Sequence, residues 1–201
     1  NSALNPVAKK KKVIIAGGGV AGCGAARVLA LRGHEPVIYE KSSRLGGNLL
    51  AAGAPDFKED DIALANWFVN EIQRLNVPVH FNTEVTKELV LQSCADTVIV
   101  ATGSTPKSLN LGNDEIVYTA AEVLLGEKDP GQEVAVIGGG LVGCETALWL
   151  AKEGKTVAIV EALDQLLSVN RPLCHANSEM LEKLIPFHHI KTLTNSKALE
   201  Y

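Results

Sequence analysis

Two glycine-rich stretches of the sequence have the spacing of a phosphate-binding loop. The first, VIIAGGGVAGCGAA, occupies residues 13–26, and the second, VAVIGGGLVGCETA, occupies residues 134–147. In each, a G-x-G-x-x-G series follows an apolar run and precedes small residues, which suits a strand, a tight turn and a helix. Such a loop brings backbone N–H groups and the positive end of a helix dipole to a pyrophosphate. Alone, either stretch could equally be a tight joint between a strand and a helix.

An internal repeat decides between these readings. Residues 13–40 match residues 134–161 at 12 of 28 positions, against roughly two expected from average composition. The matches include the loop glycines, a cysteine in each loop, and the glutamates that end the two copies, Glu40 and Glu161. Because an acidic residue recurs in register with both loops, we interpret both as dinucleotide-binding loops.

Each kind of residue that the two copies share has an expected role. The first fingerprint glycine permits the turn, the second lets N–H groups approach a pyrophosphate, and the third lets helix and strand pack closely. The glutamate can accept hydrogen bonds from an adenosine ribose. The predicted binding residues are Gly17, Gly19, Val20, Ala21, Gly22 and Glu40 in the first copy and Gly138, Gly140, Leu141, Val142, Gly143 and Glu161 in the second.

Hydrophobic patterning places both loops in α/β domains. Apolar, β-branched runs predict buried parallel strands before each loop and after each helix. These runs are Val13–Ala16, Val37–Glu40, Val134–Ile137 and Val157–Glu161. A glycine, Gly33 or Gly154, should follow the end of each intervening helix. The predicted fold class is therefore α/β, with two Rossmann-like, three-layer nucleotide-binding domains.

The segment after Glu40 adds elements to the first domain. Residues 60–75 have the apolar stripe of an amphipathic helix, and residues 77–81 read as a strand. Residues 83–85 are expected to lead towards a β-meander. Residues 96–103 are expected to form a buried strand that ends in an Ala-Thr-Gly turn.

A crossover rich in Asn, Asp, Gly and Pro then spans residues 107–131, with one short helix expected at Thr119–Leu125. Trp67 and Trp149 are expected in helix cores. The predicted parts are a basic linker at 1–12, a first nucleotide-binding domain at 13–106 and a second at 107–201.

Composition excludes several functions. The net charge of −4 provides no basic field for nucleic acid, and no apolar run is long enough to cross a membrane. The chain opens without a signal peptide, so we expect a cytoplasmic location. Four cysteines without C-x-x-C or zinc-like spacing suit buried thiols in a reducing compartment. We predict no metal site, since His188 and His189 are adjacent and lack a third ligand, and no catalytic side chain.

The order of motifs resembles the two-dinucleotide flavoprotein reductases. Most similar is the C-terminal half of enoate and 2,4-dienoyl-CoA reductases, NADH:flavin oxidoreductases of the old yellow enzyme family. The stretches that carry the resemblance are GGNLLAAGAPDFKED, FNTEVT, VIVATGSTP and VIGGGLVGCETALWLAKEGKTVAIVE. It implies FAD on the first domain and NAD(P)H on the second. It also implies that the FAD site includes Lys41, Gly46, Gly47, Asn48, Leu49, Val85, Ala101, Thr102 and Gly103.

The resemblance further implies that hydride passes from NADH to FAD and that electrons continue to a barrel with FMN and a 4Fe-4S cluster. That barrel, which would reduce an enoate or enoyl-CoA-like substrate, is absent from the sequence, as is the family's C-terminal return to the FAD domain. We therefore expect a fragment that binds flavin weakly and is inactive alone. The C-x4-C and C-x-x-C pairs of related disulfide reductases do not occur, which argues against thiol–disulfide chemistry.

Two other functions stay open at this stage. The first domain could hold ADP for structure alone, although Gly46-Gly47 and the Ala-Thr-Gly turn favour a whole flavin. The chain could also belong to the small subunit of a glutamate-synthase-like electron-transfer complex. Glu161 favours NADH over NADPH because its charge would oppose a 2′-phosphate, whereas Arg171 could favour NADPH.

Overall fold

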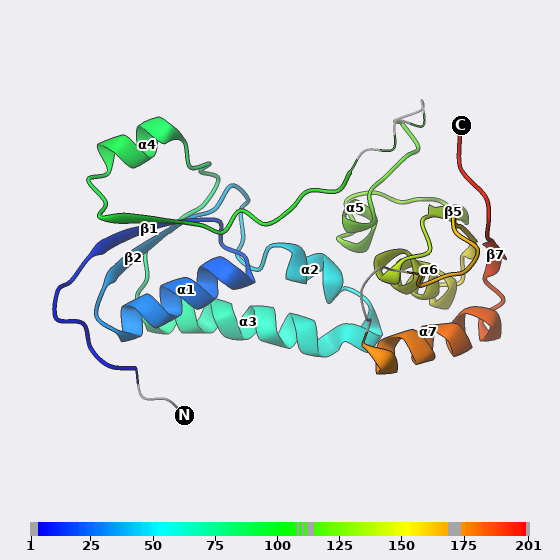
Figure 1. Cartoon of the computed structure of the whole chain (residues 1–201), viewed down its shortest axis with the longest axis horizontal. Helices are drawn as coiled ribbons and strands as arrows, with labels where there is room; N and C mark the ends of the chain where they lie inside the picture. The colour runs from blue at the N-terminus through cyan, green and yellow to red at the C-terminus, as the bar shows by residue number, and fades with distance from the viewer. Residues whose placement is uncertain (1–3, 108, 110, 112–114, 169–173, 200–201) are drawn as a thin grey trace. The chain divides into compact units, whose positions relative to one another are not determined.

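The computed structural model describes residues 4–107, 109, 111, 115–168 and 174–199 (Figure 1). The chain divides into two compact units, Asn1–Thr105 and Pro106–Tyr201, and each is described by itself. Each unit contains a parallel β-sheet and one of the glycine-rich loops. The predicted α/β class is confirmed.

The first unit contains nine elements in the part of the chain described. They are β1 (Lys12–Ala16), α1 (Val20–Leu31), β2 (Glu35–Tyr39), α2 (Asn48–Ala52), the short 3₁₀ helix η1 (Asp56–Lys58), α3 (Glu59–Arg74), β3 (Val79–His80), α4 (Lys87–Gln92) and β4 (Thr97–Val100). The strands pair in parallel in the order β3-β2-β1-β4. The chain thus runs outward from β1 to β3 and then returns to the other side of β1, so β1 and β4 flank the switch point where such sheets bind ligands.

The core of this unit lies between the sheet and the helices α1 and α3, which cover the same side of the sheet, while α4 lies on the other side (Figure 1). Small residues of α1 let the helix approach the sheet: Cys23 and Ala26 are fully buried. From α3, the stripe residues Ala65 and Ile72 are buried, as its amphipathic pattern predicts. Helix α1 ends at Leu31, with Arg32 as its C-cap, and Gly33 follows with φ +91°, as predicted.

The second unit repeats this plan with fewer strands in its described part. Its elements are α5 (Ala120–Leu124), β5 (Glu133–Ile137), α6 (Leu141–Lys152), β6 (Thr156–Val160), α7 (His175–Phe187) and β7 (Lys191–Leu193). The parallel sheet has the order β5-β6-β7, and α6 packs against α7. Helix α5 confirms the short predicted helix, because Thr119 and Glu122 form a complete capping box at its start.

The structural repeat extends beyond the matching sequence. In the first unit, α3 is followed by Asn76 at φ +51°, and the N–H of Val77 donates to Ile72 at 3.1 Å. In the second unit, α7 is followed by His189 at φ +55°, and the N–H of Ile190 donates to Ile185 at 3.1 Å. The pair α7–β7 is therefore the counterpart of α3–β3, even though the two segments share little sequence.

Two expectations about the strands and loops of the first unit are wrong. Residues 83–85 do not enter a meander but lead to helix α4, because the Thr86 hydroxyl caps that helix by accepting the N–H of Leu89 at 3.2 Å. Strand β4 is not fully buried: it is the outermost strand of the sheet, and Val100 is 76% exposed.

The expectation that Trp67 lies in a helix core is also wrong. Trp67 is 44% exposed on α3, beside the buried stripe, and the guanidinium carbon of Arg27 lies 5.0 Å from its ring centre. This cation–π contact explains how the indole is accommodated at a surface. Trp149 is half-buried in α6. None of the described helices is long and apolar enough to cross a membrane.

Candidate dinucleotide-binding sites

The first glycine loop joins β1 to α1 at the carboxyl end of the sheet. Gly17 has φ +105°, and its N–H donates to the carbonyl oxygen of Tyr39 at 2.8 Å. A Cβ at Gly17 would collide with the backbone of Ala101, and one at Gly22 would collide with the carbonyl oxygen of Gly17. Glycine is therefore required at both positions, as predicted from the turn and the helix packing.

The second loop, between β5 and α6, has the same geometry. Gly138 has φ +104°, and its N–H donates to the carbonyl oxygen of Val160 at 2.8 Å. A Cβ at Gly143 would collide with the carbonyl oxygen of Gly138. Among the described residues, nothing lies within 4 Å of a Cβ built at Gly138 or Gly140, so this loop is more open than the first.

Both loops present backbone N–H donors at the start of a helix. In α1 the first intrahelical bond runs from the N–H of Cys23 to Gly19 at 2.9 Å, so the N–H groups of Val20, Ala21 and Gly22 have no acceptor within the helix. In α6 the corresponding bond runs from the N–H of Cys144 to Gly140 at 2.9 Å, so the N–H groups of Leu141, Val142 and Gly143 likewise have no acceptor within the helix. Neither helix has an acidic residue in its first turn. Free donors and a positive dipole end fit a pyrophosphate.

Glu40 follows β2 and is buried beneath the first loop. Its Oε2 accepts the N–H of Gly18 at 2.6 Å, and its Oε1 accepts the N–H of Ser42 at 2.8 Å. Burial raises the pKa of Glu40, but the hydrogen bonds from Ser42 and Gly18 outweigh it and leave the pKa below its usual value. The neighbouring Lys41, exposed to solvent, lowers the pKa further. Glu40 is therefore a carboxylate at neutral pH.

Glu161 makes the same pair of bonds in the second unit. Its Oε2 accepts the N–H of Gly139 at 2.6 Å, and its Oε1 accepts the N–H of Leu163 at 2.7 Å. Hydrogen bonds from Leu163 and then Gly139 lower the pKa of Glu161. Because each carboxylate oxygen has a further lone pair, either glutamate can still accept a bond from a ribose hydroxyl.

The glycine pair after β2 closes over the first loop. The N–H of Gly46 donates to the carbonyl oxygen of Gly18 at 2.9 Å. A Cβ at Gly47, which has φ +55°, would lie 3.0 Å from the Cα of Gly19. Helix α2 begins at the next residue, Asn48, followed by Leu49. The structure thus brings Gly46 and Gly47 directly against the first glycine loop, and Asn48 and Leu49 follow them in α2.

The turn after β4 also packs against the first glycine loop. Ala101 donates its N–H to Ala16 at 2.8 Å and lies against Gly17, and exposed Thr102 and Gly103 follow. The side chain of Asn48 donates to the carbonyl oxygen of Ser104 at 3.4 Å, which links α2 to this turn.

Val85 lies farther along the chain, half-buried in the loop before α4. Two residues before it, the N–H of Thr83 donates to the backbone carbonyl oxygen of Glu40 at 2.9 Å, so this loop begins beside the end of β2. Arg171, weighed above as a partner for a 2′-phosphate, lies outside the residues that the structure describes.

The middle glycine of each triplet was missed in the sequence prediction. Gly18 and Gly139 provide the N–H groups that the two glutamates bind. A Cβ at Gly18 would collide with Leu45 and would lie 3.2 Å from the Glu40 carboxylate. Neither glycine has a positive φ, so close packing is the reason for glycine here. The signal was present, because both copies read Gly-Gly-Gly rather than G-x-G.

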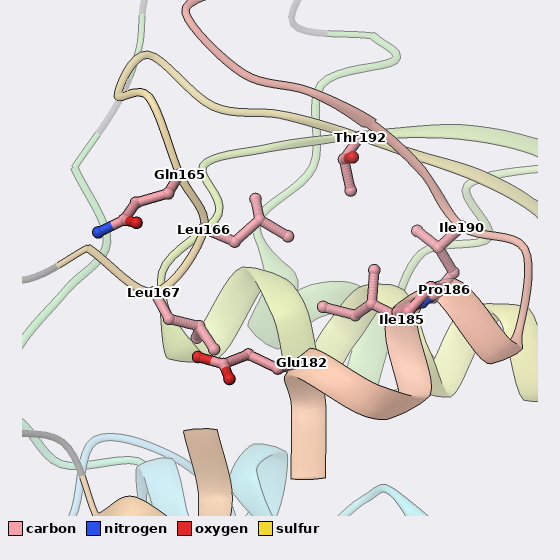
Figure 2. A pocket seen from close by; sticks show the side chains of 8 residues that line it. All are labelled: Gln165, Leu166, Leu167, Glu182, Ile185, Pro186, Ile190 and Thr192. Atoms are coloured by element: carbon pink, nitrogen blue, oxygen red, sulfur yellow. The ribbon is translucent and has the colours of Figure 1, made fainter. Parts of the chain in front are cut away.

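A pocket of about 400 Å³ lies in the second unit between the loop after β6, helix α7 and strand β7 (Figure 2). Its lining residues are Gln165, Leu166, Leu167, Glu182, Ile185, Pro186, Ile190 and Thr192. Leu166 packs against Gly139, and the N–H of Leu167 donates to the Gly139 carbonyl oxygen at 2.8 Å. The pocket and the second glycine loop therefore share a wall.

The cysteines fall into two groups. Cys23 and Cys144 are fully buried, and burial raises their pKa to about 11 and about 12. Cys94 and Cys174 are exposed, so the expectation of buried thiols is wrong for these two. Within the described ranges, no cluster of three or more His, Cys, Asp or Glu side chains could hold a metal ion. His188 and His189 lie in the turn between α7 and β7.

Known proteins share this architecture. Residues 11–201 match the family described as pyridine nucleotide-disulphide oxidoreductase. The chain is 49% identical over 186 residues to cinnamate reductase of Clostridium sporogenes, which covers 92% of this chain and 28% of that protein. It is 41% identical over 170 residues to an NADH oxidase of Thermoanaerobacter brockii, covering 82% of this chain and 26% of that protein.

A solved structure of 2-naphthoyl-CoA reductase in complex with 2-naphthoyl-CoA matches with a TM-score of 0.89 at 29% identity, over 98% of this chain and 30% of that chain. The chain thus spans less than a third of the length of these relatives. The matches confirm the expected resemblance to enoate-reductase-type enzymes and the class of NAD(P)H-dependent flavin oxidoreductases. Since the family match covers nearly the whole sequence, the chain belongs to the pyridine nucleotide-disulphide oxidoreductase family.

Proposed function

We propose that the chain is an electron-transfer module in which the first unit binds FAD and the second binds NADH. One observation carries this proposal: the same assembly of glycine loop, helix start and hydrogen-bonded carboxylate is built twice, at the carboxyl ends of two parallel sheets. Hydride transfer between a nicotinamide and a flavin requires one dinucleotide site for each of the two cofactors.

The first unit suits FAD because two further segments surround its loop. Gly46 and Gly47 close over Gly18 and Gly19, and the turn at Ala101 packs against Gly17. ADP would need only the first β-α-β unit, whereas these segments extend the site towards a flavin. The residues proposed to bind FAD are Gly17, Gly19, Val20, Ala21, Gly22, Glu40, Lys41, Gly46, Gly47, Asn48, Leu49, Val85, Ala101, Thr102 and Gly103.

The second unit suits NADH because Glu161 is an ionised acceptor beside an open loop. Its carboxylate can accept bonds from the ribose hydroxyls and would oppose a phosphate at the 2′ position. The residues proposed to bind NADH are Gly138, Gly140, Leu141, Val142, Gly143 and Glu161. This assignment corresponds to domains at 13–106 for FAD and 107–201 for NADH, after a basic linker at 1–12.

The cofactors supply the chemistry, which is transfer of hydride from nicotinamide C4 to flavin N5. The residues of this chain would bind the pyrophosphates and orient the riboses. No acid–base pair is needed for such a transfer, so we assign no catalytic side chain.

We propose that the chain works within a longer reductase. The relatives named above are more than three times its length, and one is named for reducing cinnamate, an enoate. A barrel with FMN and a 4Fe-4S cluster would receive the electrons and reduce an enoate or enoyl-CoA-like substrate. Exposed free thiols at Cys94 and Cys174 suit a reducing, cytoplasmic setting.

The test uses the longer protein that carries this chain. It should be purified with bound FAD, and anaerobic NADH should bleach the flavin absorbance, with dithionite as the control that shows the flavin to be reducible. Flavin that dithionite reduces and NADH does not would contradict the proposal. Mass spectrometry of the nucleotide released on denaturation addresses the alternative, because ADP in place of FAD would indicate a structural nucleotide.

A further inference from the structure

Two fully buried cysteines occupy equivalent places beside the two glycine loops. The Sγ of Cys23 lies 3.2 Å from the carbonyl oxygen of Gly18, and the Sγ of Cys144 lies 3.3 Å from that of Gly139. Burial raises the pKa of both thiols far above neutrality, so each keeps its proton. Each S–H can therefore donate to the glycine carbonyl.

In each loop, both the backbone N–H and the carbonyl oxygen of the middle glycine are hydrogen-bonded. In the second unit, the Gly139 N–H is accepted by Glu161 at 2.6 Å, and its carbonyl oxygen receives both the Cys144 thiol and the N–H of Leu167 at 2.8 Å. The first unit has the same three partners for Gly18, namely Glu40, Cys23 and the N–H of Gly46. Without the thiol, the carbonyl oxygen of the middle glycine would keep only its backbone N–H partner in each loop.

Peptide geometry connects this carbonyl to the nucleotide. The carbonyl of Gly139 and the N–H of Gly140 belong to one planar trans peptide, in which they point in opposite directions. A thiol that holds the carbonyl towards the buried side therefore aims the N–H of Gly140 away from it. Gly140 is the second fingerprint glycine, whose N–H is expected at the pyrophosphate. The same holds for Gly18 and Gly19.

We propose that Cys23 and Cys144 are positioning residues, each of which aims the N–H of the second fingerprint glycine at the pyrophosphate by holding the carbonyl of the middle glycine. This inference rests on the proposed function. It assigns the thiols a role in nucleotide affinity that involves no redox chemistry.

The test compares three variants of the chain, each with one substitution in the second unit. Cys144→Ala removes the donor, Cys144→Ser keeps a donor in a similar volume, and Leu181→Val is a control that shortens a fully buried side chain of α7 and removes none of the hydrogen bonds to Gly139 described above. Binding of NADH is measured by fluorescence titration. Cys144→Ala should weaken binding about threefold to tenfold, the worth of one hydrogen bond, while Cys144→Ser stays within about twofold. Leu181→Val should bind as the unmodified chain does.

Amide hydrogen exchange without nucleotide provides an independent readout. In Cys144→Ala the N–H groups of Gly139 and Leu167 should exchange faster than in the unmodified chain, and in Cys144→Ser they should not. Unchanged exchange and affinity in Cys144→Ala, or equal losses in the Ala and Ser variants, would overturn the inference. An unmodified chain that binds no NADH would instead contradict the proposed function, and exchange would still decide whether the thiol holds the loop.

Discussion

Glu40 holds Gly18 through a 2.6 Å hydrogen bond from the glycine N–H to Oε2, and this bond recurs with the same length between Glu161 and Gly139. It ties the carboxyl end of the second strand of each sheet to the loop that follows the first strand. The glutamate is thus part of the loop's architecture as well as a candidate ribose ligand. A substitution at this position should affect stability even when no nucleotide is bound.

The first prediction concerns the loss of folding stability at low pH. The hydrogen bonds lower the pKa of Glu40 and Glu161 below the usual 4.5 in the folded state. Their contribution to stability is therefore complete above that pH and is lost as the pH falls through the folded-state pKa values. Glu40→Gln, whose single carbonyl oxygen replaces two acceptors, should lower the free energy of unfolding at pH 7 by about 1–3 kcal/mol.

Urea unfolding of the chain at pH 7, 5, 4 and 3 measures this effect. The unmodified chain should lose more stability between pH 5 and 3 than Glu40→Gln does. Glu88→Gln is a control, because Glu88 is an exposed residue of α4 and lies outside both glycine loops. Parallel pH profiles for Glu40→Gln and the unmodified chain would show that the carboxylate does not hold the loop.

The second prediction separates two glycines of helix α1. A Cβ at Gly22 would collide with the Gly17 carbonyl oxygen, a backbone atom that cannot move without opening the turn. Gly22→Ala should therefore destabilise the first unit by at least about 2 kcal/mol. At Gly24 a Cβ would meet only the Phe68 ring at 3.8 Å, an ordinary contact. Gly24→Ala should be neutral or stabilising by up to about 1 kcal/mol, because alanine favours a helix interior.

Both glycine variants can be compared by thermal unfolding followed by circular dichroism. The second copy of the repeat supports the contrast, since it retains glycine at Gly143, the counterpart of Gly22, but has Glu145 at the counterpart of Gly24. Equal melting temperatures for the two variants would mean that the turn is not built as described.

The third prediction concerns thiol reactivity. Cys94 and Cys174 are exposed, whereas Cys23 and Cys144 are buried, with pKa values raised to about 11 and about 12. Titration of the folded chain with an aromatic disulfide reagent at pH 8 should modify two thiols quickly and the other two only after unfolding. Cys94→Ser should reduce the fast class to one. Four fast thiols in the folded chain would contradict the burial of the two loop cysteines.

The fold could be predicted because its signals are local and occur twice. The loops, the strands around them and the helix-ending glycines follow from periodicity and from backbone needs that one residue can reveal. The strand at β4 was predicted as well, but its exposure was not, because burial depends on what lies beside a strand. Trp67 illustrates the same limit, since its contact with Arg27 joins two helices far apart in sequence.

The candidate sites could be predicted less fully. The fingerprint marks Gly17, Gly19 and Gly22 by spacing, whereas the role of Gly18 depends on Leu45 and Glu40, which only the folded chain brings to it. The helix at α4 was missed for another reason. Its start depends on the single side chain of Thr86, and the six-residue helix is too short for a periodic signal.

The last prediction concerns the choice of nicotinamide cofactor and depends on Glu161. Both of its oxygens are held by backbone N–H groups, so the carboxylate has a fixed position beside the loop. Two unit charges 4 Å apart repel by roughly 4 kcal/mol at an effective dielectric constant of about 20, and a 2′-phosphate would meet this repulsion. Even about 2 kcal/mol corresponds to roughly thirtyfold discrimination. The longer enzyme should therefore reduce its flavin with a kcat/KM for NADH at least about tenfold above that for NADPH.

Glu161→Ser removes this charge and should narrow the ratio of the two kcat/KM values. The substitution also frees the N–H of Gly139, which weakens both cofactors alike, so the ratio and not either value alone reports the charge. Asp164→Asn is the matched control, because it removes a charge from the same loop at an exposed side chain and should leave the ratio close to that of the unmodified enzyme. Equal use of NADH and NADPH by the unmodified enzyme would refute the assignment. A ratio that Asp164→Asn lowers as much as Glu161→Ser would trace the selectivity to the net charge of the loop instead of to the fixed carboxylate.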